Sequence, residues 1–445
     1  MKKTWELPVI PAVSKDGFYF VLLGAAIFIT LGWVLSHGGK MPMHDFRTAY
    51  YCGKALVNYV DPYSELEIER LYSHEAPPTD IPDPDRIVVT KNPYLPSTFP
   101  FTFLLALLPE HIGILFWTAG IAVSFLLASF LIWRTSPSQA AIPIGILAGY
   151  CLASSASLFY FANPAGFVVP LCILGCLSFI SGTFIPLGIP AFAISLAFKP
   201  HDGALIFLYF LLAGGTYRKR ALQTLLLLAV LTVPALVWLN SYFPQWSHEL
   251  SSNMAAFSGP GHVNDPRAPH GTLMMINLQT VTSFFWAQPR IYDSVSYLIC
   301  GLIVLLWIWI TLRTQVTLTN TWLALASISA LCLLPVYHRQ YDAKLIMLQL
   351  PALGQLWTRR HRSRWIALAV TALAIFLAGD LPWLVLLKVG AYLRNLGSPL
   401  PTVAADILLN FTMPLALLST GVYYLWLYIQ QTSADRVESR PKSAP

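Results

Sequence analysis

The chain has 445 residues, of which 56% are hydrophobic and only 11% are charged. Soluble domains carry about 25% charged residues, so this composition excludes a water-soluble globular protein and predicts a polytopic membrane protein. The formal net charge is +7, but the basic residues fall in short clusters between apolar segments, which is typical of cytoplasmic loops. We therefore expect membrane lipid, and no nucleic acid, among the partners of the chain.

The first apolar segment covers residues 18–36 and follows a short N-terminus that contains Lys2, Lys3 and Lys15. A cleaved signal peptide has a shorter apolar region followed by small residues, whereas this segment ends in Ser36-His37-Gly38. We interpret it as a retained transmembrane helix whose N-terminal end lies inside the cell.

Further apolar runs recur along the chain, most of them long enough to cross ~30 Å of hydrocarbon. When the runs are threaded alternately, the basic clusters fall on the side of the N-terminus, as the positive-inside rule requires. The pattern predicts an all-α bundle of about twelve transmembrane helices with both ends in the cytoplasm. The predicted spans are residues 18–36, 111–133, 140–160, 165–181, 184–198, 203–215, 221–239, 294–312, 320–336, 343–357, 365–387 and 404–429.

We expect one transmembrane domain over residues 1–429, followed by a disordered cytoplasmic tail at 430–445. The first outer loop, 37–110, is expected to carry interfacial helices, because its stretch 99–108 is too short to span and too apolar for open water. The second outer loop is 240–293. Loops of this length are uncommon in compact proteins and tend to be functional.

Asp45 is the first candidate site residue. It follows the first predicted span by nine residues and lies beside His44 and close to Arg47. An aspartate before Phe-Arg-Thr-Ala-Tyr-Tyr also has the pattern of a helix N-cap, and a cap likewise fixes the direction of a carboxylate. The residues alone leave both interpretations open, a cap and a catalytic base.

A second group of candidates, Lys199, His201 and Asp202, lies at a turn between two short apolar segments. Pro200 interrupts the helix there because it removes a backbone donor. A cationic turn near the outer face suits a phosphate group, which lysine commonly binds as a point charge. The alternative is a lysine that snorkels to the interface above a solvated turn.

A third group lies at the later turn 336–342, where Tyr337, His338, Arg339 and Asp342 form a dense polar cluster. The forked guanidinium of arginine suits phosphate oxygens, so we expect Arg339 and His338 to hold a phosphate. A structural ion pair between Arg339 and Asp342 is the alternative.

Other polar residues favour less specific interpretations. The histidines of the second outer loop show no zinc-binding spacing, and five of the six cysteines lie in apolar runs, where cysteine acts as a small hydrophobe. Asn163 and the stretch 277–279 favour turn or capping roles, with contact to a substrate hydroxyl as the alternative. No Gly-x-Gly-x-x-Gly or Walker motif occurs, so nucleotide cofactors are not expected. The loop histidines are His248, His262 and His270.

The segment from Asp45 to Leu56 reads Asp-Phe-Arg-Thr-Ala-Tyr-Tyr-Cys-Gly-Lys-Ala-Leu, and Asp-Pro-Tyr follows at 61–63. With the later Lys-Pro turn at 199–200, this order resembles glycosyltransferase family 87. These are polytopic enzymes of GT-C type that include polyprenyl-phosphate-mannose-dependent mannosyltransferases. The chain departs from the family pattern at Val60, where a glycine usually stands, and at Phe99-Pro100, which replaces Tyr-Pro-Pro.

The resemblance implies a GT-C-like bundle and a glycosyltransferase (a hexosyltransferase) with its active site on the extracytoplasmic side of the plasma (inner) membrane. It implies an inverting transfer of a hexose or pentose, with mannose as the leading expectation. The donor would be a polyprenyl-phosphate sugar, and the acceptor a glycolipid or polysaccharide of the cell envelope. A polytopic transporter or lipid flippase and an inactive relative acting as an assembly partner are the alternatives.

In this scheme Asp45 matches the proposed catalytic base of the family and Lys199 the lysine of its Lys-Pro turn. No metal and no cofactor is required. The residues expected to bind the donor phosphate are Lys199, His201, His338 and Arg339. The residues expected to support them are His44, Arg47, Tyr51, Asp202, Tyr337 and Asp342.

Overall fold

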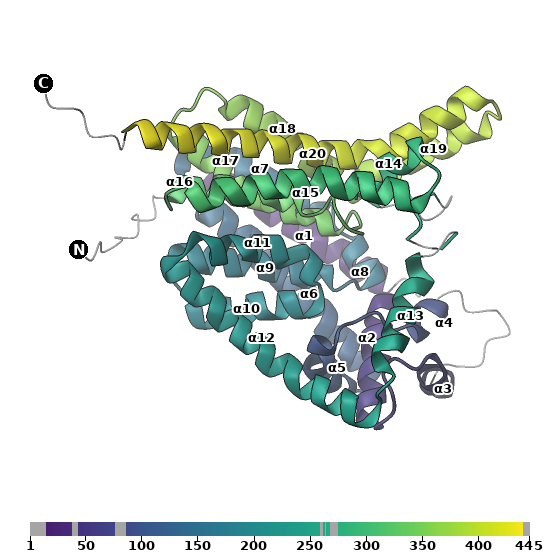
Figure 1. Cartoon of the computed structure of the whole chain (residues 1–445). Helices are drawn as coiled ribbons and strands as arrows, with labels where there is room; N and C mark the ends of the chain where they lie inside the picture. The colour runs from purple at the N-terminus through teal and green to yellow at the C-terminus, as the bar shows by residue number, and fades with distance from the viewer. Residues whose placement is uncertain are drawn as a thin grey trace, which may run out of the picture.

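The computed structural model describes residues 15–37, 43–75, 86–258, 261–262, 264–267 and 275–438. Within these residues the regular secondary structure is helical, and the one β-bridge is an isolated pair between Met275 and Arg339. The expected class, a helical membrane protein, is confirmed (Figure 1).

Six helical segments among the described residues are long and apolar enough to cross a membrane. They are α1 (Lys15–His37), α6 (Glu110–Arg134), the segment Ser138–Phe161 with α7 (Ala141–Ala153) and α8 (Ser157–Phe161), α12 (Gly215–Tyr242), α15 (Pro289–Arg313) and α20 (Pro399–Glu438). Each of the twelve predicted spans overlaps helix, but six are too short or too bent to pass as single spans. The count of twelve therefore stays a prediction. The shorter apolar helices are α9 (Ala165–Ser181), α10 (Ile185–Phe198), α11 (Pro200–Ala213) and α16 (Leu318–Leu331).

The segment expected as one span at 365–387 is broken into α18 (Arg364–Leu377) and α19 (Asp380–Asn395), which are bent by 66°. Side chains from the later turn satisfy the carbonyls that the break exposes. Gln340 Nε2 donates to the carbonyls of Leu377 and Gly379 at 3.0 and 2.7 Å. The buried Lys344 donates to the carbonyl of Ala378 and, at 2.9 Å, to that of Ser154. Because side-chain donors replace the missing backbone donors at these carbonyls, a broken helix can be accommodated in an apolar environment.

A disordered tail was expected from residue 430, but the helix α20 continues to Glu438 and includes residues 430–438. Thr432 is buried there, and its hydroxyl lies 3.0 Å from that of Thr314 at the end of α15. This contact extends the packing of α20 beyond its apolar part. Residues 439–445 lie outside the described residues.

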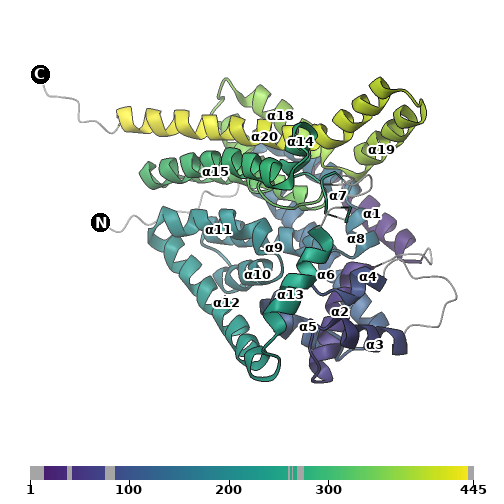
Figure 2. The ribbon, with the colours of Figure 1, turned by 45° about the vertical axis from the view of Figure 1, so that its right-hand side comes forward.

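The two predicted outer loops pack against each other at one end of the molecule, where both views show α2 to α5 beside α13 (Figures 1 and 2). The stretch expected at the interface forms α5, which packs on α2 so closely that a Cβ at Gly53 would overlap the Thr102 carbonyl. Asn253 of α13 donates to the carbonyls of Tyr63 and Asn92 at 3.0 and 3.3 Å. These elements are α2 (His44–Val57), α3 (Glu65–Glu75), α4 (Arg86–Thr90), α5 (Phe99–Ala106) and α13 (Trp246–Ser258).

The remaining short elements lie in the two outer segments, before α7, and at or after the later turn. They are the 3₁₀ turns η1 (Pro96–Thr98), η2 (Ser138–Ala140) and η3 (Asp342–Leu348), and the helices α14 (Gln279–Phe285) and α17 (Gln349–Thr358).

Candidate functional site

Asp45 lies in the first turn of α2, which begins at His44 after Met43. The cap position therefore belongs to Met43, and the N-cap interpretation of Asp45 is wrong. Instead, Asp45 Oδ2 accepts a hydrogen bond from Asn163 Nδ2 at 2.8 Å. Asn163 Oδ1 accepts from the backbone N–H of Ala165 at 2.9 Å, which turns the NH₂ group of the amide toward the carboxylate. The half-buried carboxylate thus has a defined direction.

Aromatic contacts connect the start of α2 to the Lys199 turn. The hydroxyl of Tyr94 donates to the backbone carbonyl of Asp45 at 3.2 Å, and its ring meets the ring of Phe198 edge-on, with centroids 6.4 Å apart. Phe198 directly precedes Lys199. Tyr94 therefore lies between the carboxylate-bearing helix and the first cationic turn.

A second aromatic series connects the same helix to the later turn. The ring of His44 lies 5.4 Å from that of Phe161, and Phe161 lies 6.4 Å from Tyr341. The ammonium of Lys199 sits 5.3 Å from the centroid of the Tyr341 ring. Three regions that are distant in sequence therefore meet in one place.

Lys199 is buried and its ammonium is shared by two carboxylates. Its Nζ lies 2.5 Å from Asp342 Oδ1 and 3.6 Å from Asp202 Oδ2. Burial would lower the pKa of Lys199, but the two carboxylates outweigh burial and raise it. The lysine is therefore charged and holds the two turns together. Its place between two carboxylates differs from the expected contact with a donor phosphate.

Asp342 does not pair with the side chain of Arg339, so the alternative interpretation of this turn, a structural ion pair between the two side chains, is wrong. Asp342 Oδ2 accepts a hydrogen bond from the backbone N–H of Arg339 at 2.8 Å, and Asp342 Oδ1 accepts one from the ammonium of Lys199. The guanidinium of Arg339 donates to the hydroxyl of Tyr337 and lies 3.4 Å from Asn264 Oδ1. Arg339 is half-buried, and Asn264 brings the second outer segment to it.

The electrostatics of Arg339 connect it to Asp45. Burial would lower the pKa of Arg339, but Tyr337, Tyr341 and the carboxylate of Asp45 together raise it. Tyrosines are uncharged near neutral pH, so Asp45 is the group that carries negative charge toward Arg339 under those conditions. Asp45 makes the smallest of these contributions, so the aromatic contacts through Tyr94 and Phe161 are the stronger link between its helix and the two turns.

The stretch 275–279 supports the later turn through its backbone. The N–H of Ile276 donates to the carbonyl of His338 at 3.1 Å, and the N–H of Leu278 donates to that of Leu334 at 2.9 Å. Gln279 Nε2 donates to the carbonyl of Pro335 at 2.6 Å. These contacts favour a structural role for the 277–279 stretch.

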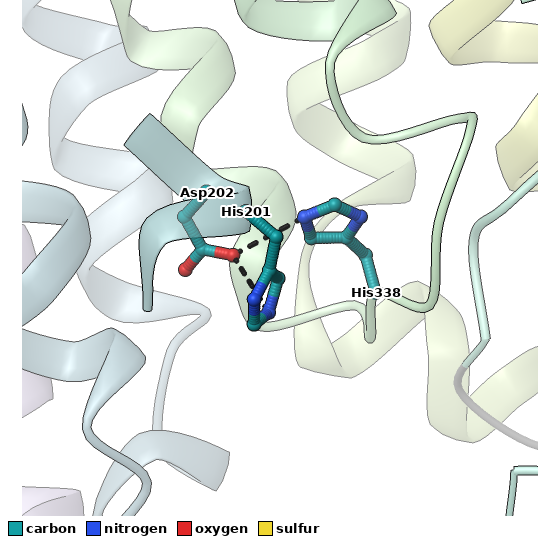
Figure 3. A group of neighbouring side chains, drawn as sticks. All are labelled: His201, Asp202 and His338. Carbon is teal, nitrogen blue, oxygen red and sulfur yellow. Dashed lines mark ion pairs between the residues drawn. The ribbon is translucent and has the colours of Figure 1, made fainter. Parts of the chain in front are cut away.

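His201 and His338 both direct Nε2 at Asp202 Oδ1, at 3.5 and 3.2 Å (Figure 3). The side chain of His338 is fully buried, whereas that of His201 is 36% exposed to solvent. The expected contact of the pair with a donor phosphate stays a prediction, and in the structure both rings face a carboxylate. This two-histidine, one-carboxylate group was missed because its members come from turns far apart in sequence.

Two of the expected supporting residues contact the first outer segment and the start of α6. Arg47 forms an ion pair with Glu110 at 3.1 Å, and Tyr51 is buried with its ring edge-on to that of Tyr72, at 5.2 Å. Both serve the packing of the first outer segment. Sequence reasoning gave Tyr94 no role and Asn163 only a general one, although an asparagine before Pro164 between apolar runs does signal a turn.

The loop histidines do not form a site within the described part of the chain. His248 and His262 are exposed and belong to no cluster of metal-ligating groups there. His270 lies outside the described residues.

A surface hollow of about 430 Å³ is lined by Gly215, Arg218 and Lys219 at the start of α12. The hollow lies just after α11, whose 14 residues span ~20 Å. It is therefore separated from the Lys199 turn by about the length of that helix. The hollow contains none of the candidate site residues.

Comparison of the chain with protein-family models, with curated proteins and with solved structures finds no match. The function is therefore inferred from the fold and the geometry of the site.

Proposed function

We propose that the protein is an integral membrane glycosyltransferase of GT-C type. It moves a sugar, with mannose as the first candidate, from a polyprenyl-phosphate donor to a glycolipid or polysaccharide acceptor at the outer membrane face. The observation that carries the proposal is the oriented carboxylate of Asp45, which aromatic contacts through Tyr94 and Phe161 bring close to the Lys199 turn and the later turn.

In the proposed reaction, Asp45 accepts the proton of the acceptor hydroxyl while that oxygen attacks the anomeric carbon. The bond between the anomeric carbon and the phosphate oxygen breaks, and the lipid phosphate leaves with the bonding electrons. Attack opposite the leaving group inverts the anomeric centre. A lipid phosphate needs charge stabilisation rather than a proton in order to leave, so no general acid is required.

Two side chains are available to meet the leaving phosphate, because Arg339 and His201 both keep partial exposure. Lys199 and His338 lie behind them, buried against Asp342 and Asp202. We therefore assign direct phosphate contact to Arg339 and His201, and assign the positioning of the two turns to Lys199 and His338. Preorganised charge of this kind stabilises a transition state more in a partly dry site than in water.

The direct test is Asp45→Asn, assayed in membranes with a labelled polyprenyl-phosphate sugar. Loss of a general base costs about 10²–10⁴-fold, so we expect the rate of transfer to fall by that factor while the donor still binds. The change keeps the size of the side chain and its contact with Asn163.

Glu67→Gln is the matched control, because Glu67 lies on α3 of the same outer segment and pairs only with the exposed Arg70, at 2.8 Å. It should leave transfer unchanged. Transfer by Asp45→Asn within about threefold of the wild-type rate would remove the base role.

A transporter or lipid flippase is the second candidate. It is favoured by the two helix breaks, one at Lys199 and one between α18 and α19, since transporters bind substrates at discontinuous helices. The same labelled donor separates the two functions. A flippase moves it across the bilayer intact and without an acceptor, whereas a transferase releases lipid phosphate only when an acceptor is present.

A further inference from the structure

Three side chains with metal-ligating atoms converge where the two cationic turns meet. His201 and Asp202 begin α11, and His338 lies on the turn before η3. The ligand atoms of the three residues all lie within 4.8 Å of one another. Figure 3 shows the two rings directing a nitrogen at one carboxylate oxygen from different sides.

The spacing suits a tetrahedral ion. Zinc binds histidine nitrogen and carboxylate oxygen at about 2.0–2.2 Å, so neighbouring ligand atoms of a tetrahedron stand roughly 3.3–3.5 Å apart. The two distances to Asp202 Oδ1 are 3.2 and 3.5 Å. The third separation, between the ligand nitrogens of the two histidines, is within 4.8 Å.

The tautomer of His338 leaves a lone pair at this centre. Its Nδ1 lies 3.0 Å from the carbonyl of Val336, which can only accept, so Nδ1 carries the proton. Nε2 then faces Asp202 and forms no hydrogen bond with any described residue, and neither carboxylate oxygen of Asp202 accepts one from them. A ligating histidine is typically held in this way, with its other nitrogen donating to a carbonyl.

The two buried groups, Asp202 Oδ1 and His338 Nε2, need either a proton or a metal ion between them. An uncharged imidazole that faces a carboxylate at 3.2 Å, with both groups fully buried, places two electron pairs against each other at high cost. Lys199 approaches the opposite oxygen, Oδ2, at 3.6 Å and is itself neutralised by Asp342. Asp202 Oδ1 thus remains directed toward the two histidines.

We propose that His201, Asp202 and His338 bind one divalent transition-metal ion, with zinc as the best fit. Imidazole ligands favour zinc and its first-row neighbours over magnesium and calcium, which prefer oxygen. Three protein ligands leave one tetrahedral position open, and the partial exposure of His201 places that position toward the outside of the cluster.

One consequence rests on the proposed function. With neutral histidines, two cations (Lys199 and Arg339) stand against three carboxylates, those of Asp45, Asp202 and Asp342. An anionic donor would then meet a site with one net negative charge. A divalent ion reverses the sign to one net positive charge, and the donor phosphate would then meet the ion at its open position, in place of the direct contact with His201.

The test measures metal binding directly, without donor or acceptor. The full-length protein is purified in detergent with a tag that contains no histidine, stripped with a chelator, and titrated with Zn²⁺ and with Co²⁺. We expect one ion per chain, and the Co²⁺ form should show the intense visible absorption of tetrahedral cobalt. His201→Ala and Asp202→Asn should each weaken binding by at least about tenfold.

His248→Ala is the control, because His248 is an exposed histidine of the second outer segment, and it should bind as the wild type does. His201→Ala is the decisive variant, because a half-exposed residue at a helix start can be truncated without loss of the fold, which a thermal transition checks. No bound metal in the folded wild type, or unchanged binding by folded His201→Ala, overturns the proposal. Binding together with full transfer by Asp45→Asn would instead contradict the proposed function alone.

Discussion

Asn163 uses both ends of its amide, with one end on the backbone of α9 and the other on Asp45. A hydrogen bond to a charged group stabilises by about 1.5–3 kcal/mol, so this contact is strong enough to hold the carboxylate in one direction. An oriented base is more effective than a mobile one because the reacting geometry is set before the substrate arrives. Asn163 is therefore a positioning residue of the proposed site.

A pair of carboxyl groups joins the two outer segments away from this site. Asp61 accepts from the N–H of Tyr63 at 2.9 Å, and Glu249 of α13 comes to the same turn. Burial, followed by the hydrogen bond and the charge of Asp61, raises the pKa of Glu249 to about 7. A hydrophobic contact between Tyr63 and Trp246, with ring centroids 6.0 Å apart, lies beside the pair.

The raised pKa makes the docking of α13 depend on pH. A carboxyl group with a higher pKa in the folded state binds more protons when folded, so stability is greatest below its unfolded value near 4.5 and falls as the pH rises through about 7. We expect a lower thermal transition in detergent at pH 8 than at pH 5, with a smaller difference in Glu249→Gln. Glu65→Gln, which removes an exposed pair with Lys91, should keep the wild-type difference. Equal pH dependence in Glu249→Gln and wild type would contradict this assignment.

At the scale of elements, glycines set how closely α1 packs against α7. A Cβ at Gly24 would overlap the carbonyl of Gly149, and a Cβ at Gly149 would overlap that of Phe20. The contact is backbone against backbone, which is the way small residues bring helices together in membranes. Because α7 leads through α8 to Asn163, this contact also positions the residue that orients Asp45.

Gly149→Leu should therefore separate α1 from α7. Overpacking of this kind costs about 1–3 kcal/mol or more, and here the obstacle is backbone that cannot move aside. We expect a lower thermal transition and reduced transfer activity. Gly120→Leu is the matched control, since a Cβ at Gly120 on α6 meets nothing within 4 Å. A transition in Gly149→Leu equal to that of the control would show that the close contact is not required.

The later turn serves two breaks in the helical structure at once. Asp342 anchors Lys199 beside the break between α10 and α11, while Gln340 and Lys344 hold the break between α18 and α19. Buried carbonyls left without partners cost about 1–3 kcal/mol each, which explains why polar side chains occur in so apolar a region.

At the scale of the whole molecule, the distribution of basic clusters predicts that the candidate site faces outward and that the turn after α17 faces the cytoplasm. Single cysteines can test this, because the six native cysteines are all buried. In intact cells a membrane-impermeant thiol reagent should label Tyr59→Cys, because Tyr59 lies in the first outer segment, after the end of α2, and is 81% exposed in the wild type. Thr358→Cys at the end of α17 should be labelled only after permeabilisation. Labelling of Thr358→Cys in intact cells, and of Tyr59→Cys only after permeabilisation, would contradict the predicted topology.

The apolar runs predicted where helices lie because burial in hydrocarbon requires about 20 residues whose backbone groups bond internally. They did not predict the bend after Leu377, since the bond partners that permit it, Gln340 and Lys344, come from another part of the chain. The extension of α20 to Glu438 likewise depends on a contact with α15.

Hydropathy and charge are properties of local stretches, so they were enough to predict a helical membrane protein and to find the polar turns between its apolar segments. What those turns do together depends on the packing of the helices. That packing paired Asp45 with Asn163, placed Lys199 between two carboxylates, and brought His201, Asp202 and His338 to one centre. Each of these contacts joins side chains from distant segments, and their geometry depends on how the helices pack.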